Sequence, residues 1–241
     1  MEISVKKLSF LFLSVLAISL SACNNSCIKG SGHVATENRK VKAFGEIELS
    51  GAFKVSLIQD SSNTVAIKAD DNVLKLIKTD ISGNKLKITI DAKSICSDNP
   101  VTIAIGVRDL RSIKTSGAVE VASTAKINTG DLAINLSGAS KINLDVNAAN
   151  VTIKGSGINE IILKGQAASH TVNFTGSGKL KAFDFVVAKY DIETTGDAEC
   201  EINVLSDLSV NTTGAATVKY KGTPSKISKS ETGSLTLNKI E

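Results

Sequence analysis

The sequence predicts an all-β protein that folds as a solenoid, in which each repeat forms one coil of about 19–20 residues. The first observation is a Ser/Thr-Gly turn that returns seven times, with glycines 21, 19, 19, 20, 18 and 19 residues apart. The second is the alternation of apolar and polar residues on both sides of each turn, which is typical of strands with one buried face. The turn glycines are Gly117, Gly138, Gly157, Gly176, Gly196, Gly214 and Gly233.

One repeat illustrates how each unit is built. Alternating strands at 132–136 and 142–146 flank the turn Ser137-Gly138-Ala139. A two-stranded hairpin is an alternative for each unit because the turn is short, but stacked coils account better for the fixed period. Glycine in such a turn supplies a positive φ or room for the neighbouring coil. We therefore interpret the turn motif as structural rather than ligand-binding.

The N-terminus predicts export and lipidation. Residues 1–22 have the parts of a lipoprotein signal peptide: Lys6 and Lys7, then an apolar run from 8 to 20 that is short for a transmembrane helix. The run ends in Leu20-Ser21-Ala22-Cys23, the pattern of a bacterial lipobox, which predicts lipidation of Cys23. The alternative is an ordinary secretory signal with Cys23 as a structural thiol. Several acyl chains on one cysteine would give stable membrane anchoring.

The residues after Cys23 bear on location. Asn24 follows the cysteine, and by resemblance to enterobacterial sorting this disfavours retention in the inner membrane. We expect an outer-membrane lipoprotein, and the sequence leaves open whether it faces the periplasm or the surface. Residues 23–36 are expected to form a tether, with a flexible stretch at Gly30-Ser31-Gly32.

The domain is expected to span residues 37–241, with regular coils from about 110 to 237. Its first part contains strand-like stretches without the tight period, so it is expected to be an irregular cap. A cap would cover the unpaired strands and apolar rows that an open end exposes. Residues 73–77 can form either a short helical turn or a strand.

The charges exclude one class of partner. The net charge is only +4, and the lysines are scattered among acidic residues rather than gathered in a stripe. We therefore expect no nucleic-acid partner. No motif indicates a cofactor.

At this point the chain resembles a known family, the head-GIN domain family of adhesins. The matching pieces are Glu37-Asn38-Arg39, Ser50-Gly51-Ala52-Phe53, the repeated Ser-Gly-Ala turns and Tyr220-Lys221-Gly222-Thr223-Pro224, and Gly157-Ile158-Asn159 spells the motif letters. The resemblance runs from about residue 30 to 237. Departures are Thr for Ser in four turns, and Asp197 and Ser234 after glycine. The resemblance implies a right-handed parallel β-helix and offers no catalytic residues.

The cysteines leave a pairing question. If Cys23 is lipidated, Cys27, Cys96 and Cys200 remain, and an exported protein meets an oxidising compartment. A disulfide between Cys27 and Cys96 would tie the tether to the cap. Cys200 lies between two glutamates of a strand and is expected to be unpaired. Pairing between molecules stays an alternative.

Candidate catalytic and metal-ligating residues are sparse. His33 and His170 are far apart, the first in the tether and the second at an expected coil corner, so we expect no metal site. Alternation should put the first two residues of the densest acidic stretch on one outward face and the last two on another, and β-helix polysaccharide lyases and hydrolases use stacked carboxylates on such a face. A solvated strand face is the simpler interpretation. Recurring asparagines near the corners predict side-chain ladders. The acidic residues are Asp191, Glu193, Asp197, Glu199 and Glu201.

Together these features favour a lipid-anchored envelope protein without catalytic activity, an adhesin or scaffold that offers flat repeated faces. Its expected partners are the membrane, through the N-terminal lipid, and a glycan or an envelope protein. The alternative is a polysaccharide lyase or hydrolase that uses the acidic face Asp191–Glu201. The oligomeric state is left open.

Overall fold

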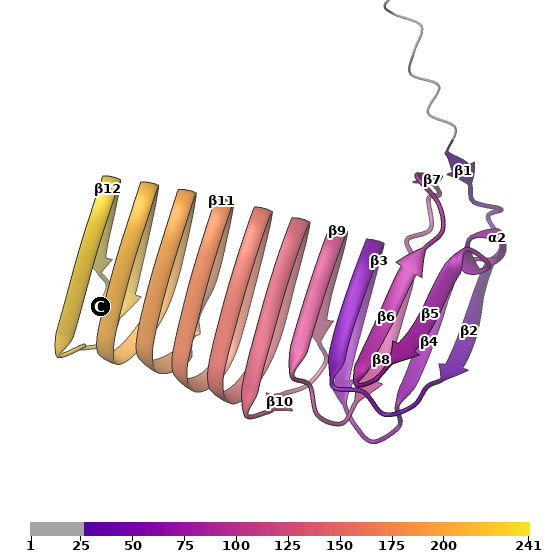
Figure 1. Cartoon of the computed structure of the whole chain (residues 1–241), viewed down its shortest axis with the longest axis horizontal. Helices are drawn as coiled ribbons and strands as arrows, with labels where there is room; N and C mark the ends of the chain where they lie inside the picture. Colours follow the sequence, from indigo (N-terminus) through magenta and orange to yellow (C-terminus); the bar gives the residue numbers. More distant parts are fainter. Residues whose placement is uncertain (1–26) are drawn as a thin grey trace, which may run out of the picture.

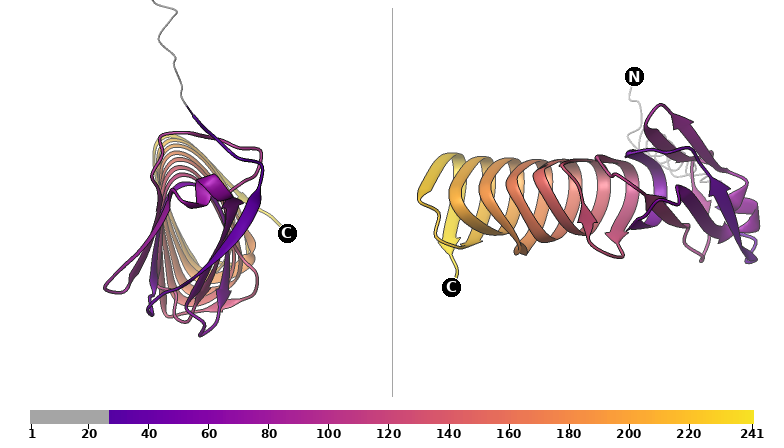
Figure 2. Two further views of the ribbon diagram at one scale, coloured as in Figure 1. Left: turned by 90° about the vertical axis from the view of Figure 1, so that its right-hand side faces the viewer. Right: turned by 90° about the horizontal axis from the view of Figure 1, so that it is seen from below.

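The computed structural model describes residues 27–241 and is almost entirely β-structure. The expected signal peptide and the cysteine of the expected lipobox lie outside these residues. Parallel layers run side by side along the long axis, and a cap with antiparallel pairs closes one end (Figure 1). Seen along that axis the layers superimpose (Figure 2).

The repeats form β9 (Ser112–Ser123), β10 (Ile127–Asn128), β11 (Asp131–Lys221) and β12 (Lys226–Lys239). β11 is 91 residues long because each turn is tight enough for the strand pairing to continue through it. We call the stretch centred on one turn glycine a layer. Neighbouring layers pair in parallel and in register, with Gly117 beside Gly138 and Gly214 beside Gly233. No described pair within these layers is a hairpin.

The stack begins one layer earlier than the sequence period indicates. β3 (Glu46–Gln59) pairs in parallel with β9, and Gly51 lies beside Gly117. The period is hidden because the chain leaves the stack after β3 and builds the cap before it returns as β9. The regular layers therefore start at Glu46 rather than near residue 110. The signal for this layer was present in Ser50-Gly51-Ala52.

The cap covers the open side of β3. β6 (Lys85–Ile90) and β8 (Thr102–Val107) pair in parallel with the two halves of β3. β5 pairs antiparallel with β6, β4 with β8, and β2 with β4. α2 is a single helical turn next to β4 that includes Val73 and Leu74, whereas Ile77 is the first residue of β5, so residues 73–77 contain part of each alternative. The remaining elements are β2 (Val34–Lys40), β4 (Thr64–Asp70), α2 (Asp71–Leu74) and β5 (Ile77–Ser82).

Part of the expected tether is ordered on the cap. β1 (Ile28–Lys29) pairs in parallel with β7 (Ile95–Cys96), and β2 begins at Val34. Asn72 donates a hydrogen bond from Nδ2 to the Lys29 carbonyl at 2.7 Å. The described part of 23–36 therefore lies along the domain instead of extending away from it.

The core is a set of aliphatic rows that continue from layer to layer. Every second residue of each layer points inward, and the row Ile134, Ile153, Val172 and Ile192 is fully buried. Each fully buried aliphatic side chain contributes about 1.5–3 kcal/mol relative to exposure. The alternation of apolar and polar residues that predicts the strands therefore also places the apolar side chains in the core.

Candidate functional site

The turn glycines form one column along the stack. Each has a positive φ, for example 94° at Gly138 and 92° at Gly157. A Cβ added to Gly138 would lie 2.6 Å from the carbonyl oxygen of Gly117 in the preceding layer. Gly157 meets the Gly138 carbonyl in the same way. The column is therefore a backbone contact between layers, and it leaves no space for a ligand.

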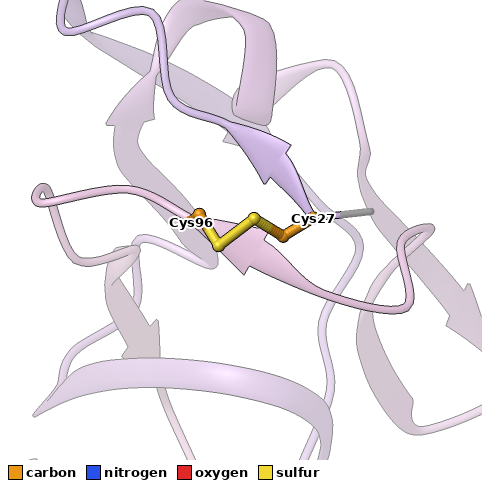
Figure 3. The surroundings of a disulfide bond; sticks show 2 residues. All are labelled: Cys27 and Cys96. Carbon is orange, nitrogen blue, oxygen red and sulfur yellow. A yellow bond between two sulfur atoms is a disulfide. The ribbon is translucent and has the colours of Figure 1, made fainter. Parts of the chain in front are cut away.

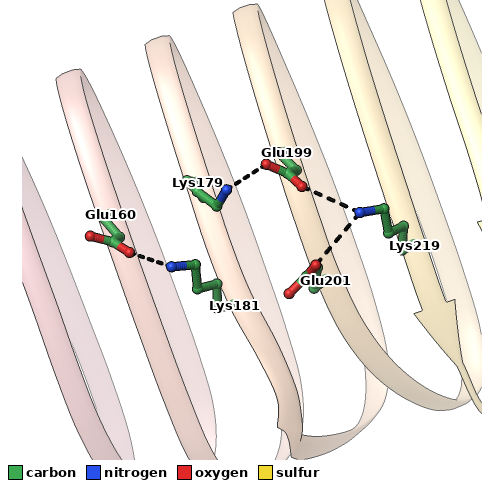
Figure 4. A network of polar contacts seen from close by, with 6 residues as sticks. All are labelled: Glu160, Lys179, Lys181, Glu199, Glu201 and Lys219. Carbon is green, nitrogen blue, oxygen red and sulfur yellow. Dashed lines mark hydrogen bonds and ion pairs between the residues drawn. The ribbon is translucent and has the colours of Figure 1, made fainter.

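The acidic stretch is divided between two faces. Asp191 and Glu193 precede the Gly196 turn, and both are exposed. Glu199 and Glu201 follow the turn and are half-buried beneath lysines. Lys219 Nζ lies 3.4 Å from Glu199 Oε1 and 3.6 Å from Glu201 Oε1 (Figure 4). The two carboxylate pairs thus do not converge on one point.

The residue three positions after the turn glycine alternates in charge through six successive layers. We call Lys54, Glu120, Lys141, Glu160, Lys179 and Glu199 the alternating row. Lys179 Nζ donates to Glu199 Oε2 at 2.7 Å, and Lys181 Nζ to Glu160 Oε1 at 2.6 Å (Figure 4). The glycine period contains this signal, because it brings these residues into one register, whereas the acidic stretch taken by itself does not.

The pKa values on this face follow from these pairs. The hydrogen bond from Lys181 lowers the pKa of Glu160, and the bonds from Lys179 and Lys219 lower the pKa of Glu199. The hydrogen bond to Glu199 raises the pKa of Lys179. A general acid at neutral pH needs a raised carboxyl pKa. These two carboxylates are shifted in the opposite direction.

Two polar ladders run along the corners of the stack. Asn147 Nδ2 donates to Asn128 Oδ1 at 3.2 Å, one layer below. Asn150 Nδ2 donates to Asp131 Oδ1 at 2.7 Å, and Ser169 Oγ donates to Asn150 Oδ1 at 2.6 Å. The expected asparagine ladders are therefore present at these positions, and they tie one layer to the next.

His170 lies in the core, not at a corner as the sequence indicated. It is 0 % exposed, and its ring lies 4.9 Å from the ring of Tyr190 and 5.5 Å from that of Phe185. Both ring nitrogens and the Tyr190 hydroxyl have no hydrogen-bond partner among the described residues. Burial lowers the pKa of His170 to about 3, so the imidazole is neutral.

Cys200 is a buried free thiol, as expected from its place in a strand. Burial raises its pKa to about 12. A thiol in that environment stays protonated and is a poor nucleophile. His33 lies in the cap, far from this region along the chain. Within residues 27–241, no three His, Cys, Asp or Glu side chains are arranged to hold a metal ion.

Cys27 and Cys96 form a disulfide that fastens β1 to β7 (Figure 3). The segment carrying Cys96 is also held from the other side by Asp70, which is 1 % exposed. Asp70 accepts hydrogen bonds from Ser97 Oγ at 2.5 Å and from Asn99 Nδ2 at 2.8 Å. The pairing that the cysteine count left open is thus intramolecular, and it fixes the N-terminal segment to the cap.

A pocket of about 520 Å³ lies between this segment and the Gly51 turn. β6 ends at Ile90 and β8 begins at Thr102, so residues 91–101 replace the tight turn of the other layers. The longer segment does not pack tightly on the turn below it. Phe53, Ile90, Ile95 and Val101 line the resulting space. No sequence signal indicated this pocket, because it depends on where the cap returns to the stack.

The far end of the stack carries charges at inward positions. Lys229 continues the row of Val210, and Glu231 continues that of Thr212, both of which are buried. In β12 these two residues are exposed. Inward-pointing charges on an edge strand oppose further strand pairing.

Among residues 27–241, no helix is long and apolar enough to cross a membrane.

Comparison with known proteins gives a family and a fold. The family described as "Putative auto-transporter adhesin, head GIN domain" matches residues 43–224, well over half of the chain. No curated protein matches the sequence. The structure is similar to that of a putative adhesin from Bacteroides fragilis, with a TM-score of 0.83, 23% identity, and coverage of 88% of this chain and 100% of that one.

Two structures from Parabacteroides distasonis are also similar. One, a putative adhesin, has a TM-score of 0.71 and 18% identity, and the match covers 88% of this chain and 99% of that one. The other, called a putative lipid binding protein, has a TM-score of 0.69 and 22% identity, and the match covers 89% and 99%. At these identities the similarity concerns the fold alone.

Proposed function

The chain belongs to the family described as "Putative auto-transporter adhesin, head GIN domain", and from that premise we propose that it is a lipid-anchored display protein of the cell envelope. Cys23 carries the lipid, the cap stands next to the membrane, and the stack offers its flat faces to a glycan or an envelope protein. Many weak polar contacts along the layers would provide the attachment. The proposed role needs no catalytic activity.

One observation carries this proposal: the disulfide of Cys27 lies four residues after the lipobox cysteine. A structural disulfide fits an exported protein, because such bonds persist in oxidising compartments. Four extended residues reach at most about 14 Å. A lipid on Cys23 would therefore keep the cap within that distance of the membrane surface.

The finer fold is part of the same proposal. We infer that the layers wind as a right-handed parallel β-helix. The parallel, in-register pairing of β9, β11 and β12 supports it. Crossover connections between parallel strands are right-handed in roughly 98% of cases. A crystal structure with a left-handed winding would contradict this inference.

The anchoring is tested by metabolic labelling with an alkyne fatty acid, followed by membrane fractionation. The wild-type chain should be labelled and should sediment with the outer membrane. Cys23→Ser should lose the label and either leave the membrane or keep its signal peptide. Cys200→Ser serves as the matched control and should keep the label. Label that persists in Cys23→Ser would sink the proposal.

The absence of catalysis in the proposal is tested separately. The purified protein is incubated with a panel of acidic and neutral polysaccharides, and reducing ends and unsaturated products are measured. We expect no turnover. Turnover that disappears in Glu193→Ala but survives in Glu231→Ala would favour the enzyme instead.

A further inference from the structure

We propose that the pocket under residues 91–101 binds the acyl chain of an anionic single-chain lipid, such as a free fatty acid. The inference rests on the proposed function only for the source of that lipid, which is the membrane that Cys23 would enter. We call the space the cap pocket. It is lined by Ala52, Phe53, Ile90, Ile95, Pro100 and Val101, among others.

The cap pocket has the size and lining of a ligand site. Its volume of about 520 Å³ lies within the usual range of about 300–1,000 Å³. Its walls are mainly apolar, whereas the faces of the stack carry hydroxyls, amides and ion pairs. Each CH₂ of an acyl chain that enters the pocket is removed from water, which favours binding. A short apolar chain is therefore the occupant that these walls favour.

The charges at the pocket select the head group. Lys54 and Lys93 line it, and no Asp or Glu does. Lys54 makes only a long ion pair, with Nζ 4.0 Å from Glu120 Oε2, and both side chains are largely exposed. Lys93 is exposed and makes no ion pair with any residue from 27 to 241. Two available ammonium groups beside an apolar space complement a carboxylate or phosphate on an acyl chain.

The pocket is held open before a ligand arrives. The disulfide from Cys27 fastens residue 96, and the two hydrogen bonds to Asp70 fasten residues 97 and 99. On the opposite wall, Phe53 packs beside Gly51, where an added Cβ would lie 2.8 Å from the Phe53 ring. A preformed pocket does not pay the ordering entropy of a mobile loop on binding.

The cap pocket lies close to the proposed lipid anchor, so the membrane is the source of its ligand. Cys27 directly precedes β1, which pairs with β7, and Ile95 of β7 lines the pocket. The proposed lipid on Cys23 lies only four residues before Cys27. Single-chain lipids that leave the leaflet in which the Cys23 lipid is inserted would thus reach the pocket without crossing bulk water.

The test uses the full chain in its native membranes. Isolated membranes are incubated with palmitic acid that carries a diazirine and an alkyne, irradiated, and the protein is digested for mass spectrometry. We expect crosslinks concentrated in peptides that contain residues 51–54 and 90–101. An excess of palmitate should remove them. Hexadecyltrimethylammonium, which has the same chain and a cationic head, should compete at least tenfold less well.

Matched variants locate the site. Ala52→Trp fills the cap pocket and should reduce the crosslinks at least fivefold. Ala139→Trp changes the same turn position two layers away and should leave them unchanged. Lys93→Glu should weaken competition by palmitate, and Lys164→Glu, an exposed lysine elsewhere, should not. Each variant is first checked for folding by protease resistance, and the lysine pair keeps the test decisive if the tryptophan variant misfolds.

The outcomes separate this inference from the proposed function. Crosslinks spread evenly over the layers, or equal in wild type and Ala52→Trp, would overturn the pocket. Competition by the cationic amphiphile as strong as that by palmitate would overturn the choice of an anionic head. If Cys23 carries no lipid but the pocket peptides are labelled, only the proposed anchoring fails. If Cys23 is lipidated and the pocket is unlabelled, only the inference fails.

Discussion

At the scale of the residue, the turn column depends on glycine. In Gly138→Val the Cβ would approach the Gly117 carbonyl oxygen, and a β-branched residue would be held at a φ of 94°. We expect a loss of about 1–3 kcal/mol in the free energy of unfolding, measured by denaturant melts. In Gly233→Val the Cβ would likewise meet the Gly214 carbonyl oxygen, but the cost should be smaller because the terminal layer can shift without disturbing a layer beyond it.

The control for that prediction is Ala139→Val, an exposed residue next to the turn. It should change stability by less than about 0.5 kcal/mol. Ser140, the next residue along, is unsuitable as a control. It is buried, and its Oγ lies 2.8 Å from Thr115 Oγ1. If Gly138→Val is as well tolerated as Ala139→Val, the backbone contact in the column is not needed.

His170 should make the fold sensitive to acid. Its pKa is about 3 in the folded protein and about 6.5 in the unfolded chain, so the unfolded state binds the extra proton. The contribution of the neutral His170 side chain to the free energy of unfolding is therefore fully present above pH 6.5 and is lost as the pH falls toward 3. At pH 5 the loss from this residue should be about 2 kcal/mol.

Unfolding free energies measured between pH 7.5 and pH 5 test this dependence. His170→Phe should flatten the curve by about that amount, because phenylalanine does not titrate. His33→Gln, which removes the other histidine, at an exposed position, is the control variant. An unchanged slope in His170→Phe would show that the buried imidazole is not the group responsible.

At the scale of the element, adjacent layers are joined by ion pairs whose strength depends on geometry. Lys181 and Glu160 approach to 2.6 Å, with the carboxylate side chain 32% exposed. A double-mutant cycle with Lys181→Gln and Glu160→Gln should give a coupling of about 0.2–1 kcal/mol that falls in high salt. The pair Lys126–Asp145, at 3.8 Å, is the control and should give a smaller coupling.

The elements also show what the sequence can and cannot predict. The strands of the repeats follow directly from alternation and the glycine period, and the family resemblance is confirmed by the match to residues 43–224. The glycine period does not predict the layer of β3, because its partner β9 is distant in sequence. The prediction of His170 at a coil corner is wrong, because its side chain points inward and is fully buried in the core.

The candidate sites were harder to predict than the strands. The acidic residues were found, but their pairing with lysines of other layers requires the register between repeats. The cap pocket arises from residues 91–101, which carry no motif. Its existence depends on β6 and β8 pairing with β3 on either side of that segment. Local sequence cannot encode a space that three distant segments enclose.

At the scale of the whole molecule, the two ends differ. The cap closes one end, while β12 pairs only with β11 in the described chain. Lys229 and Glu231 stand at inward positions on that edge. We expect the double variant Lys229→Val with Glu231→Leu to associate with itself, because it extends the apolar rows and removes the charges that oppose pairing. Sedimentation velocity at several concentrations measures this.

Ser230→Leu is the matched control, since Ser230 lies beside the exposed Asn211 and points outward. It adds apolar surface without extending the inner rows and should leave the sedimentation coefficient unchanged. Equal association of both variants would mean that added hydrophobicity, rather than the open edge, drives it.

The detour of the chain between β3 and β9 also affects the order of assembly. Pairing Gly51 with Gly117 closes a loop roughly three times as long as the loop between successive repeats. Loop-closure entropy then costs about 1 kcal/mol more for this contact than for the later ones. Layers of the repeats can thus form early from local contacts, and the join between β3 and β9 forms late. The walls of the cap pocket do not depend on that join, because residues 51–54 and 90–101 are brought together by the pairing of β6 and β8 with β3. The cap with its pocket and the stack of repeats can therefore form as two separate units before β3 and β9 join them.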